Sequence, residues 1–197
     1  MALCYAVARR AWRSVLSFAM GVILAGCSAA LDWREAGLTA AVPALLPCKP
    51  ERAERAVPLL GPQAAPVTLR MASCAADGVT WAVAEAALPA AASAEAALTA
   101  WQRASWATLG LAQAEGAAAL PPGWAEVPCV GRGATLQRCL RGPGRAPDGR
   151  AVMAELHWSA REGWIVQAAA YAPPERAPTP LARETFFGAL VWRGAVP

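Results

Sequence analysis

Apolar and polar positions alternate in the first half of the chain in a way that predicts two neighbouring β-strands. Within residues 67–71 the odd-numbered positions are apolar and the even-numbered ones are polar, which is the period of a half-buried strand. The pair Asp77-Gly78 then predicts a hairpin turn, and residues 79–83 (VTWAV) return as the second strand. Two earlier stretches, residues 45–50 and 56–60, are candidates for short strands, and the prolines of the first suit a sheet edge.

The apolar period changes to that of a helix after Pro89. Residues 89–113 are rich in alanine, and their larger residues recur near helical spacing at Leu98, Trp101, Ser105, Leu109 and Ala112. Pro89 and Ser93 are suitable start signals, and Gly116 is a suitable stop. The pattern predicts one long helix that lies on a sheet.

The second half of the chain predicts a further hairpin and a short closing helix. Residues 142–149 (GPGRAPDG) are a predicted loop whose Asp-Gly end opens the hairpin. The two strands, joined by a turn at residues 161–163, carry their apolar positions at Val152, Ala154, Leu156, Trp158, Trp164, Val166, Ala168 and Ala170. Thr179, followed by Pro180, can cap a helix over residues 181–191. The side chains expected on its buried side are Phe186, Phe187, Leu190 and Val191.

This order of elements predicts an α+β fold in which one long and one short helix pack on an antiparallel sheet. Five stretches resemble a group of uncharacterised proteobacterial lipoproteins with a Mog1/PsbP-like domain: LPCKP at 46–50, GVTWAV at 78–83, PDGR at 147–150, GWIVQA at 163–168 and ETFFGAL at 184–190. The resemblance covers residues 43–192 and implies the same layout. Its matching positions are structural, so it implies a fold and no reaction.

Residues 1–26 predict a lipoprotein signal peptide. Arginines and no acidic residue precede an apolar stretch over residues 15–25, which is the order of a secretory signal. The stretch is shorter than the about 20 apolar residues that a membrane-spanning helix needs. The sequence LAGC at residues 24–27 resembles the lipobox of bacterial lipoproteins, whose cysteine thiol receives a diacylglycerol before cleavage. The alternative is an ordinary signal peptide with a chance cysteine near its cleavage site.

A lipid on Cys27 would anchor the mature chain, because each buried methylene contributes about 0.8 kcal/mol and more than one acyl chain holds stably. Residues 27–42 are then the lipidated cysteine and tether, and residues 43–197 are a single α+β domain. Ser28 stands where lipoproteins kept at the inner membrane typically carry Asp. The resemblance to sorted bacterial lipoproteins therefore implies the outer membrane, with its periplasmic face as the expected side. The expected partners are this membrane and an envelope protein.

Charge excludes one class of function. The 197-residue chain carries 18 Lys and Arg against 14 Asp and Glu. Removal of residues 1–26 takes away three arginines and no acid, which leaves 15 against 14. Nucleic-acid binding needs a clustered positive field, and a nearly neutral mature chain does not provide one. We therefore expect no nucleic-acid partner.

The mature domain is expected to keep four of the six cysteines, because Cys4 leaves with the signal and Cys27 takes the lipid. They are Cys48, Cys74, Cys129 and Cys139. An even number in an exported protein predicts disulfides, although four cysteines allow three pairings. The alternative is a metal site, which normally shows CxxC-like spacing that is missing here. We expect neither a metal nor a cofactor.

Local geometry favours one of the three pairings. Cys129 and Cys139 flank a glycine-bearing turn at residues 130–133 that could bring two short strands side by side. Closure of so small a loop stabilises the fold by roughly 3 kcal/mol in the chain-entropy model. Cys48 would then pair with Cys74 by elimination.

One polar triple raises the possibility of hydrolytic chemistry. Glu155, His157 and Ser159 alternate along one predicted strand and face the same side. Same-face neighbours on a strand stand about 7 Å apart, whereas a nucleophile and its base must come within about 3 Å. We therefore interpret the triple as a polar face toward solvent. The chain has no nucleophile elbow and no phosphate-binding loop, so we expect it not to be an enzyme.

Tryptophan is the one residue type in excess. Trp81, Trp158 and Trp164 occupy strand positions that alternation places inward, so core packing explains them. Trp101 and Trp106 are five residues apart on the predicted helix and cannot both point squarely at the sheet. One of them is expected to be exposed, as part of a ligand or partner surface.

The leading hypothesis is a lipid-anchored, non-catalytic envelope lipoprotein whose domain is a periplasm-facing accessory or protein-binding module. A second hypothesis is a carrier or sensor of a small apolar ligand held between the long helix and the sheet. The small alanine side chains of those facing surfaces could leave a cleft, with Trp101 or Trp106 in its lining. The two hypotheses differ in whether the domain holds a molecule or a protein.

Overall fold

The computed structural model describes residues 31–38, 42–61, 63–111 and 120–192. These residues belong to one compact unit that begins at Leu31. The predicted signal peptide, the lipobox with Cys27 and the helix stop at Gly116 lie outside the described residues.

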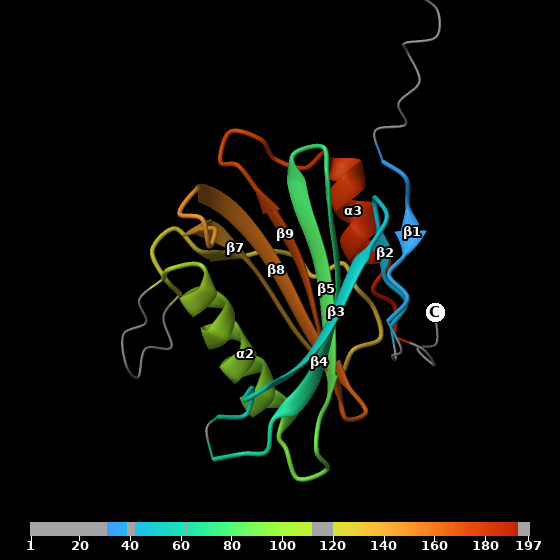
Figure 1. The fold of residues 1–197 in the computed structure, drawn as a ribbon, viewed down its shortest axis with the longest axis vertical. Helices are drawn as coiled ribbons and strands as arrows, with labels where there is room; N and C mark the ends of the chain where they lie inside the picture. The colour runs from blue at the N-terminus through green and yellow to red at the C-terminus, as the bar shows by residue number, and fades with distance from the viewer. Residues whose placement is uncertain (1–30, 39–41, 62, 112–119, 193–197) are drawn as a thin grey trace, which may run out of the picture. The chain divides into compact units, whose positions relative to one another are not determined.

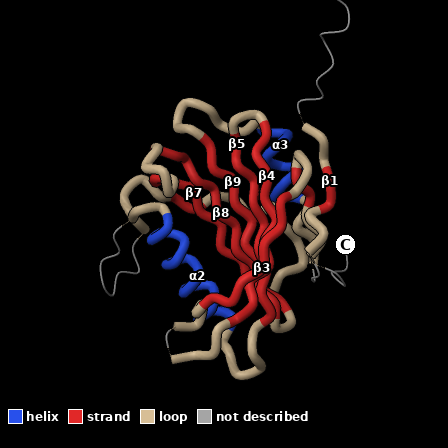
Figure 2. Tube along the Cα trace, viewed as in Figure 1, coloured by secondary structure: helices blue, strands red, loops and turns tan. Residues whose placement is uncertain are grey.

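In the described residues, seven antiparallel strands form the central sheet, in the order β3–β4–β5–β9–β8–β7–β6 (Figure 2). The strands are β3 (Glu51–Val57), β4 (Val67–Ala76), β5 (Val79–Ala87), β6 (Ala125–Glu126), β7 (Leu136–Arg145), β8 (Ala151–Arg161) and β9 (Trp164–Ala172). The predicted hairpin is confirmed, because Ala76 of β4 pairs with Val79 of β5 across Asp77-Gly78. Asp77 and Gly78 both have positive φ, as a tight hairpin turn requires.

One helix covers each face of this sheet (Figure 1). Helix α2 (Ala94–Thr108) packs on one face, over β7, β8 and β9. Helix α3 (Pro180–Gly188) packs on the other face, beside a small sheet made of β1 (Arg34–Glu35) and β2 (Leu45–Leu46). The predicted α+β architecture, an antiparallel sheet with one long and one short helix, is confirmed at this level.

Both helices begin where their capping residues predict. The Ser93 side chain accepts a hydrogen bond from the Ala96 amide at 3.3 Å and starts α2. The Thr179 side chain does the same for the Ala182 amide at 3.2 Å, and Pro180 follows at the first position of α3. Helix α2 is shorter than predicted, because residues 89–92 precede the cap at Ser93 and the helix ends at Thr108.

The β8–β9 hairpin has two inner faces, not one. Leu156 pairs with Ala169, so the even-numbered residues of β8 share the α2 face with the odd-numbered residues of β9. The even-numbered residues of β9, such as Ala168, point to the α3 face. Both strands are central and covered on both sides, which buries the polar positions of β8 as well. The expectation that Glu155, His157 and Ser159 face solvent is therefore wrong.

Strand β7 continues through residues predicted to be loop. Gly142, Pro143 and Gly144 pair with β8, and the turn begins only at Ala146. The short neighbour β6 ends its pairing at Arg141, so Pro143 lies at an open edge where its missing N–H costs no ladder bond. Local composition predicted a loop, and pairing with a long central strand overrode it.

Gly142 is required by a tryptophan that packs on it. A Cβ at Gly142 would approach the Trp124 ring to 2.3 Å. The same indole donates a hydrogen bond from Nε1 to the Pro143 carbonyl oxygen at 2.9 Å. Trp124 therefore closes over the flat glycine backbone and becomes part of the core under α2.

The chain before residue 43 belongs partly to the folded domain. Ala36 and Val42 are buried against the α3 face of the sheet. The Trp33 ring packs edge-on against Trp81 at 6.5 Å between centroids. The described part of the predicted tether is therefore packed on the sheet from Leu31 onward.

Candidate functional site

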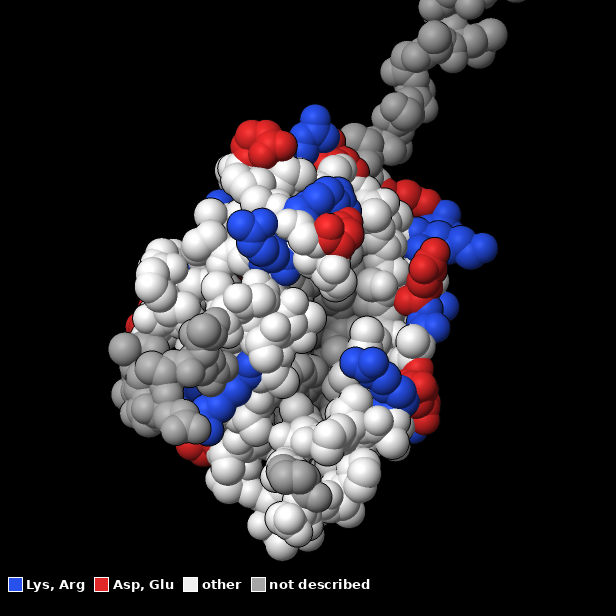
Figure 3. Space-filling model, turned by 60° about the vertical axis from the view of Figure 1, so that its left-hand side comes forward, with Lys and Arg blue, Asp and Glu red and all other residues white. Residues whose placement is uncertain are grey.

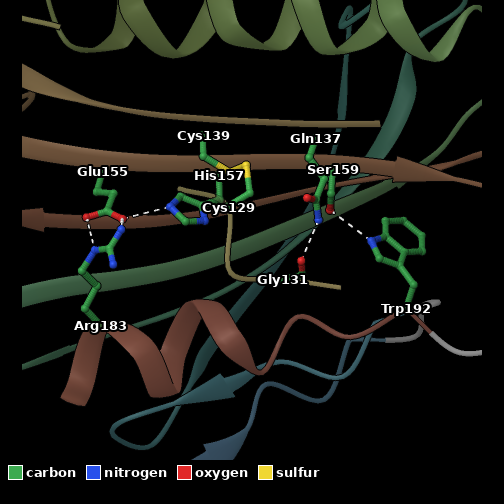
Figure 4. The surroundings of a disulfide bond; sticks show 9 residues. All are labelled: Cys129, Gly131, Gln137, Cys139, Glu155, His157, Ser159, Arg183 and Trp192. Atoms are coloured by element: carbon green, nitrogen blue, oxygen red, sulfur yellow. Dashed lines mark hydrogen bonds and ion pairs between the residues drawn. A yellow bond between two sulfur atoms is a disulfide. The ribbon is translucent and has the colours of Figure 1, made fainter. Parts of the chain in front are cut away.

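The polar groups of the predicted triple are buried beneath α3 (Figure 4). Glu155 and His157 are each 4% exposed. The two same-face side chains reach each other along the strand, and His157 Nε2 lies 2.9 Å from Glu155 Oε1. Arg183 of α3 forks onto the same carboxylate, with Nε 2.8 Å from Oε2 and Nη2 2.6 Å from Oε1. The Phe187 ring stacks on the imidazole at 3.8 Å between centroids.

Ser159 does not join this cluster. Figure 4 shows His157 turned toward Glu155 and Ser159 turned toward Trp192. The Ser159 hydroxyl accepts a hydrogen bond from Trp192 Nε1 at 3.2 Å. In the part of the chain that the structure describes, no hydrogen bond joins this hydroxyl to the imidazole, so the nucleophile and base of a triad are not in contact.

Burial and charge act against each other at this cluster. Burial raises the pKa of the Glu155 carboxyl, but hydrogen bonds from His157 and Arg183 outweigh burial and the pKa lies below its ordinary value. Burial lowers the pKa of His157, and the attraction of Glu155 offsets this only in part. At neutral pH the carboxylate is therefore charged and paired with Arg183, while the imidazole is neutral and donates from Nε2. The arrangement joins α3 to the sheet.

The predicted disulfide pairing is confirmed. Cys48 is bonded to Cys74 with a Cα–Cα distance of 5.9 Å, and Cys129 to Cys139 with 5.5 Å. The expected pair of short strands around the second disulfide is only partly present. Cys139 lies in β7, but Cys129 lies in a loop that follows β6. The Cys48–Cys74 pairing, predicted by elimination, is correct because the smaller Cys129–Cys139 loop was predicted correctly.

Trp101 and Trp106 are both buried, at 5% and 6% exposure, so the expectation that one forms an exposed surface is wrong. The buried face of α2 is wide enough to hold both rings. Ser105 also packs inward on this face, where its hydroxyl accepts a hydrogen bond from Gln167 Nε2 at 2.9 Å. Trp124 reaches over from before β6 and packs edge-on against Trp106 at 5.9 Å between centroids. This cover could not be read from the helix alone.

A cavity of about 820 Å³ opens at the C-terminal end of α2. Thr108 and Leu109 form its helical wall, and Thr80, Val152 and Tyr171 form its sheet wall. The β7–β8 turn and the segment after β9 complete its lining. Figure 3 brings the α2 side of the molecule forward and shows mainly uncharged surface at its centre, with basic and acidic side chains above. The sequence did not predict this lining, because the walls of the cavity come from four separate segments of the chain.

Within residues 31–192, apart from the gaps named above, no group of three or more His, Cys, Asp or Glu side chains could hold a metal ion. In the same described segments, no helix combines the length and the apolar character needed to cross a membrane.

Comparison of the chain with models of protein families, with curated proteins and with solved structures finds no match. The resemblance to Mog1/PsbP-like lipoproteins therefore stays a prediction from the sequence. What the chain does must be argued from its own residues.

Proposed function

We propose that this chain is a lipid-anchored envelope lipoprotein of the Mog1/PsbP-like kind. In this proposal residues 1–26 are removed, Cys27 carries diacylglycerol, and the domain faces the periplasm from the outer membrane. The observation that carries the proposal is the pair of disulfides in a domain that follows LAGC at residues 24–27. Disulfides form and persist in oxidising compartments such as the periplasm.

The proposed role is that of a non-catalytic accessory or protein-binding module. The strongest candidates for chemistry, Glu155 and His157, hydrogen-bond to each other, and Arg183 holds the carboxylate. Ser159 is bonded to Trp192. Groups used in this way stabilise the contact of α3 with the sheet, which supports a structural reading of the cluster.

The anchor is tested by intact mass spectrometry of the full-length protein extracted from its own envelope in mild detergent. We expect loss of residues 1–26, the added mass of acyl chains on Cys27 and the hydrogen loss of two disulfides. Cys27→Ala is the control, and it should keep its signal peptide because lipoprotein signal cleavage requires the lipidated cysteine. A wild-type chain cleaved without lipid would contradict the proposal.

The protein-binding role is tested on the same extract by native mass spectrometry. A co-purifying envelope protein in fixed ratio to the chain supports the role. An empty monomer, found also after crosslinking in intact cells, contradicts it.

The second candidate function is carriage of a small apolar ligand between α2 and the sheet. The observation that favours it is the cavity of about 820 Å³ at the end of α2. Pockets of about 300–1,000 Å³ hold drug-sized molecules. The ligand would lie beyond Trp106, whose ring fills the interface closer to the middle of the helix together with Trp124.

A further inference from the structure

We propose that the cavity at the C-terminal end of α2 binds an uncharged amphiphile, with an apolar body in the cavity and one carbonyl or hydroxyl oxygen that accepts a hydrogen bond from the Tyr171 hydroxyl. The inference rests on the second candidate function, since it names the class of ligand that the domain would carry. It is carried by the lining of the cavity, the charges at its rim and the position of Tyr171.

The walls of the cavity favour an apolar body. Leu109 lines the cavity from the helix and Val152 from the sheet, and Pro147, Pro173 and Pro174 add further apolar surface. Burial of apolar surface against such walls contributes about 25 cal/mol per Å². The cavity therefore suits a ligand whose surface is largely hydrocarbon or aromatic.

The rim carries charges that balance. Arg150 pairs with Asp148 at 2.7 Å, and both line the opening. Arg145 donates to the Gly149 carbonyl oxygen at 3.1 Å, and Glu175 stands at the same rim. Among the described residues neither Arg145 nor Glu175 forms an ion pair. Two basic and two acidic groups leave no net charge to attract an anion or a cation, so an uncharged ligand is favoured.

Tyr171 is the polar group that a ligand would meet. It lies on β9 directly opposite Thr80 of β5, on the face that carries α2, and it lines the cavity. Its ring is half-buried, and no hydrogen bond joins its hydroxyl to another described residue. Burial raises the pKa of Tyr171 to about 12, so the hydroxyl stays protonated and can donate. A polar group left in a largely apolar cavity gains most from a ligand that brings an acceptor.

The test compares three fluorescent probes that share a naphthalene body. Prodan carries one ketone oxygen, N-phenyl-1-naphthylamine carries no carbonyl, and 1-anilinonaphthalene-8-sulfonate adds a charge to the second. Each probe is titrated into the full-length lipoprotein in mild detergent, and its emission is corrected with the same detergent without protein. The variant Thr80→Trp places an indole in the cavity beside Tyr171 and serves as the blocked variant.

We expect prodan to saturate at one per chain in the wild type and to show no saturable binding to Thr80→Trp. Thr68→Trp is the matched control and should leave binding unchanged. Thr68 is exposed near the start of β4, whereas Thr80 of β5 pairs with Ala75 near the end of β4. Tyr171→Phe should weaken prodan about fivefold, which is the net worth of one hydrogen bond, and should leave N-phenyl-1-naphthylamine unchanged. The sulfonate should bind more weakly than its uncharged parent.

The outcomes separate the two levels of the proposal. If no probe binds the wild type above the detergent blank, or if Thr80→Trp binds as the wild type does, both carriage in this cavity and this inference are overturned. If the uncharged probes bind but Tyr171→Phe affects neither, the carrier function stands and the role of Tyr171 is overturned. Tighter binding of the sulfonate than of its parent would overturn the preference for an uncharged ligand. Circular dichroism and thermal melting of each variant show that the fold is kept.

Discussion

The two faces of the sheet are held to their helices by different means. Under α2 the contact is made by large apolar rings, with Trp101, Trp106 and Trp158 at its centre. Under α3 the contact combines aromatic rings with an ion pair between the buried Glu155 and the partly exposed Arg183. The α2 face also leaves a cavity at one end, whereas the pockets beside Glu155 and His157 on the α3 face are only about 30 Å³ and about 10 Å³.

The difference between the two faces follows from the lengths of the helices that cover them. Helix α2 is 15 residues long and alanine-rich, so it needs rings from the sheet and from Trp124 to fill the gap. Helix α3 is only 9 residues long and shares its face with β1 and β2. A short helix buries little apolar area, and a bidentate arginine pair fixes its position where packing alone is limited. The α2 face therefore tolerates a cavity, whereas the α3 face is closely packed and its helix is held in place by the ion pair.

The largest effect is expected from the tryptophans at the centre of the two faces. Trp158→Ala removes a fully buried ring on the α2 face, and Trp81→Ala removes one packed on Phe186 on the α3 face. Each should lower the free energy of unfolding by about 3–5 kcal/mol, through lost apolar burial and the space left behind. Urea denaturation followed by far-ultraviolet circular dichroism measures both. A loss below about 1 kcal/mol on either face would show that its core collapses to fill the gap.

The Cys48–Cys74 disulfide ties the strap formed by β1 and β2 to the sheet on the α3 side. It closes a loop of 26 residues, against 10 for Cys129–Cys139. In the chain-entropy model its loss costs about 3.5 kcal/mol, and loss of the shorter loop about 2.7 kcal/mol. Replacing each pair by alanines and comparing urea midpoints tests this order. A larger loss for the shorter loop would mean that strain or packing, not loop closure, sets the contribution.

Removal of Arg183 tests how strongly the α3 face depends on its charges. Arg183→Met keeps the length of the stem but leaves the Glu155 carboxylate buried without its cation. We expect a loss of about 2–3 kcal/mol, at the low end for a broken buried pair because the arginine is partly exposed. The double variant Glu155→Leu with Arg183→Met should recover most of it, since no buried charge remains. If the double variant is as unstable as the single one, the pair contributes through packing.

Local signals in the sequence predicted the elements that depend on few residues. The turn at Asp77-Gly78 and the caps at Ser93 and Thr179 act within a few residues, so they are visible in the sequence. Strand β3 was largely missed because its residues ERAERAV carry no apolar alternation. It lies at the edge of the sheet and is exposed along most of its length, so charged residues cost little there.

The candidate site, in contrast, depends on residues that are far apart along the chain. Alternation correctly placed Glu155, His157 and Ser159 on one face of β8. Their burial depends on α3, which lies more than twenty residues further along the chain, so no local pattern could reveal it. Arg183 was not singled out in the sequence, because its contact with Glu155 joins a helix and a strand that are far apart along the chain. A cleft between the long helix and the sheet was expected, but the lining by Trp101 or Trp106 was wrong, since the cavity is lined by residues such as Tyr171 and Thr80 that meet through strand pairing.

The smallest effect is expected from pH, and it acts through His157. Burial lowers the pKa of this imidazole below its ordinary value of 6.5, so the unfolded chain takes up the proton first. The free energy of unfolding should therefore fall as the pH drops from about 7 toward 5. The lowered pKa of Glu155 acts in the same direction further down, as the pH falls below its ordinary value of 4.5.

His157 is the single histidine of the chain, so the slope between pH 7 and pH 5 can be assigned to it. His157→Phe keeps a ring against Phe187 and removes the titrating group, and it should flatten this part of the profile. Urea denaturation of both proteins at several pH values makes the comparison. Trp101→Phe, on the α2 face, is the control and should keep the wild-type slope. If His157→Phe keeps that slope too, the pH dependence does not arise on the α3 face, and the contrast between a polar and an apolar face would not extend to stability against acid.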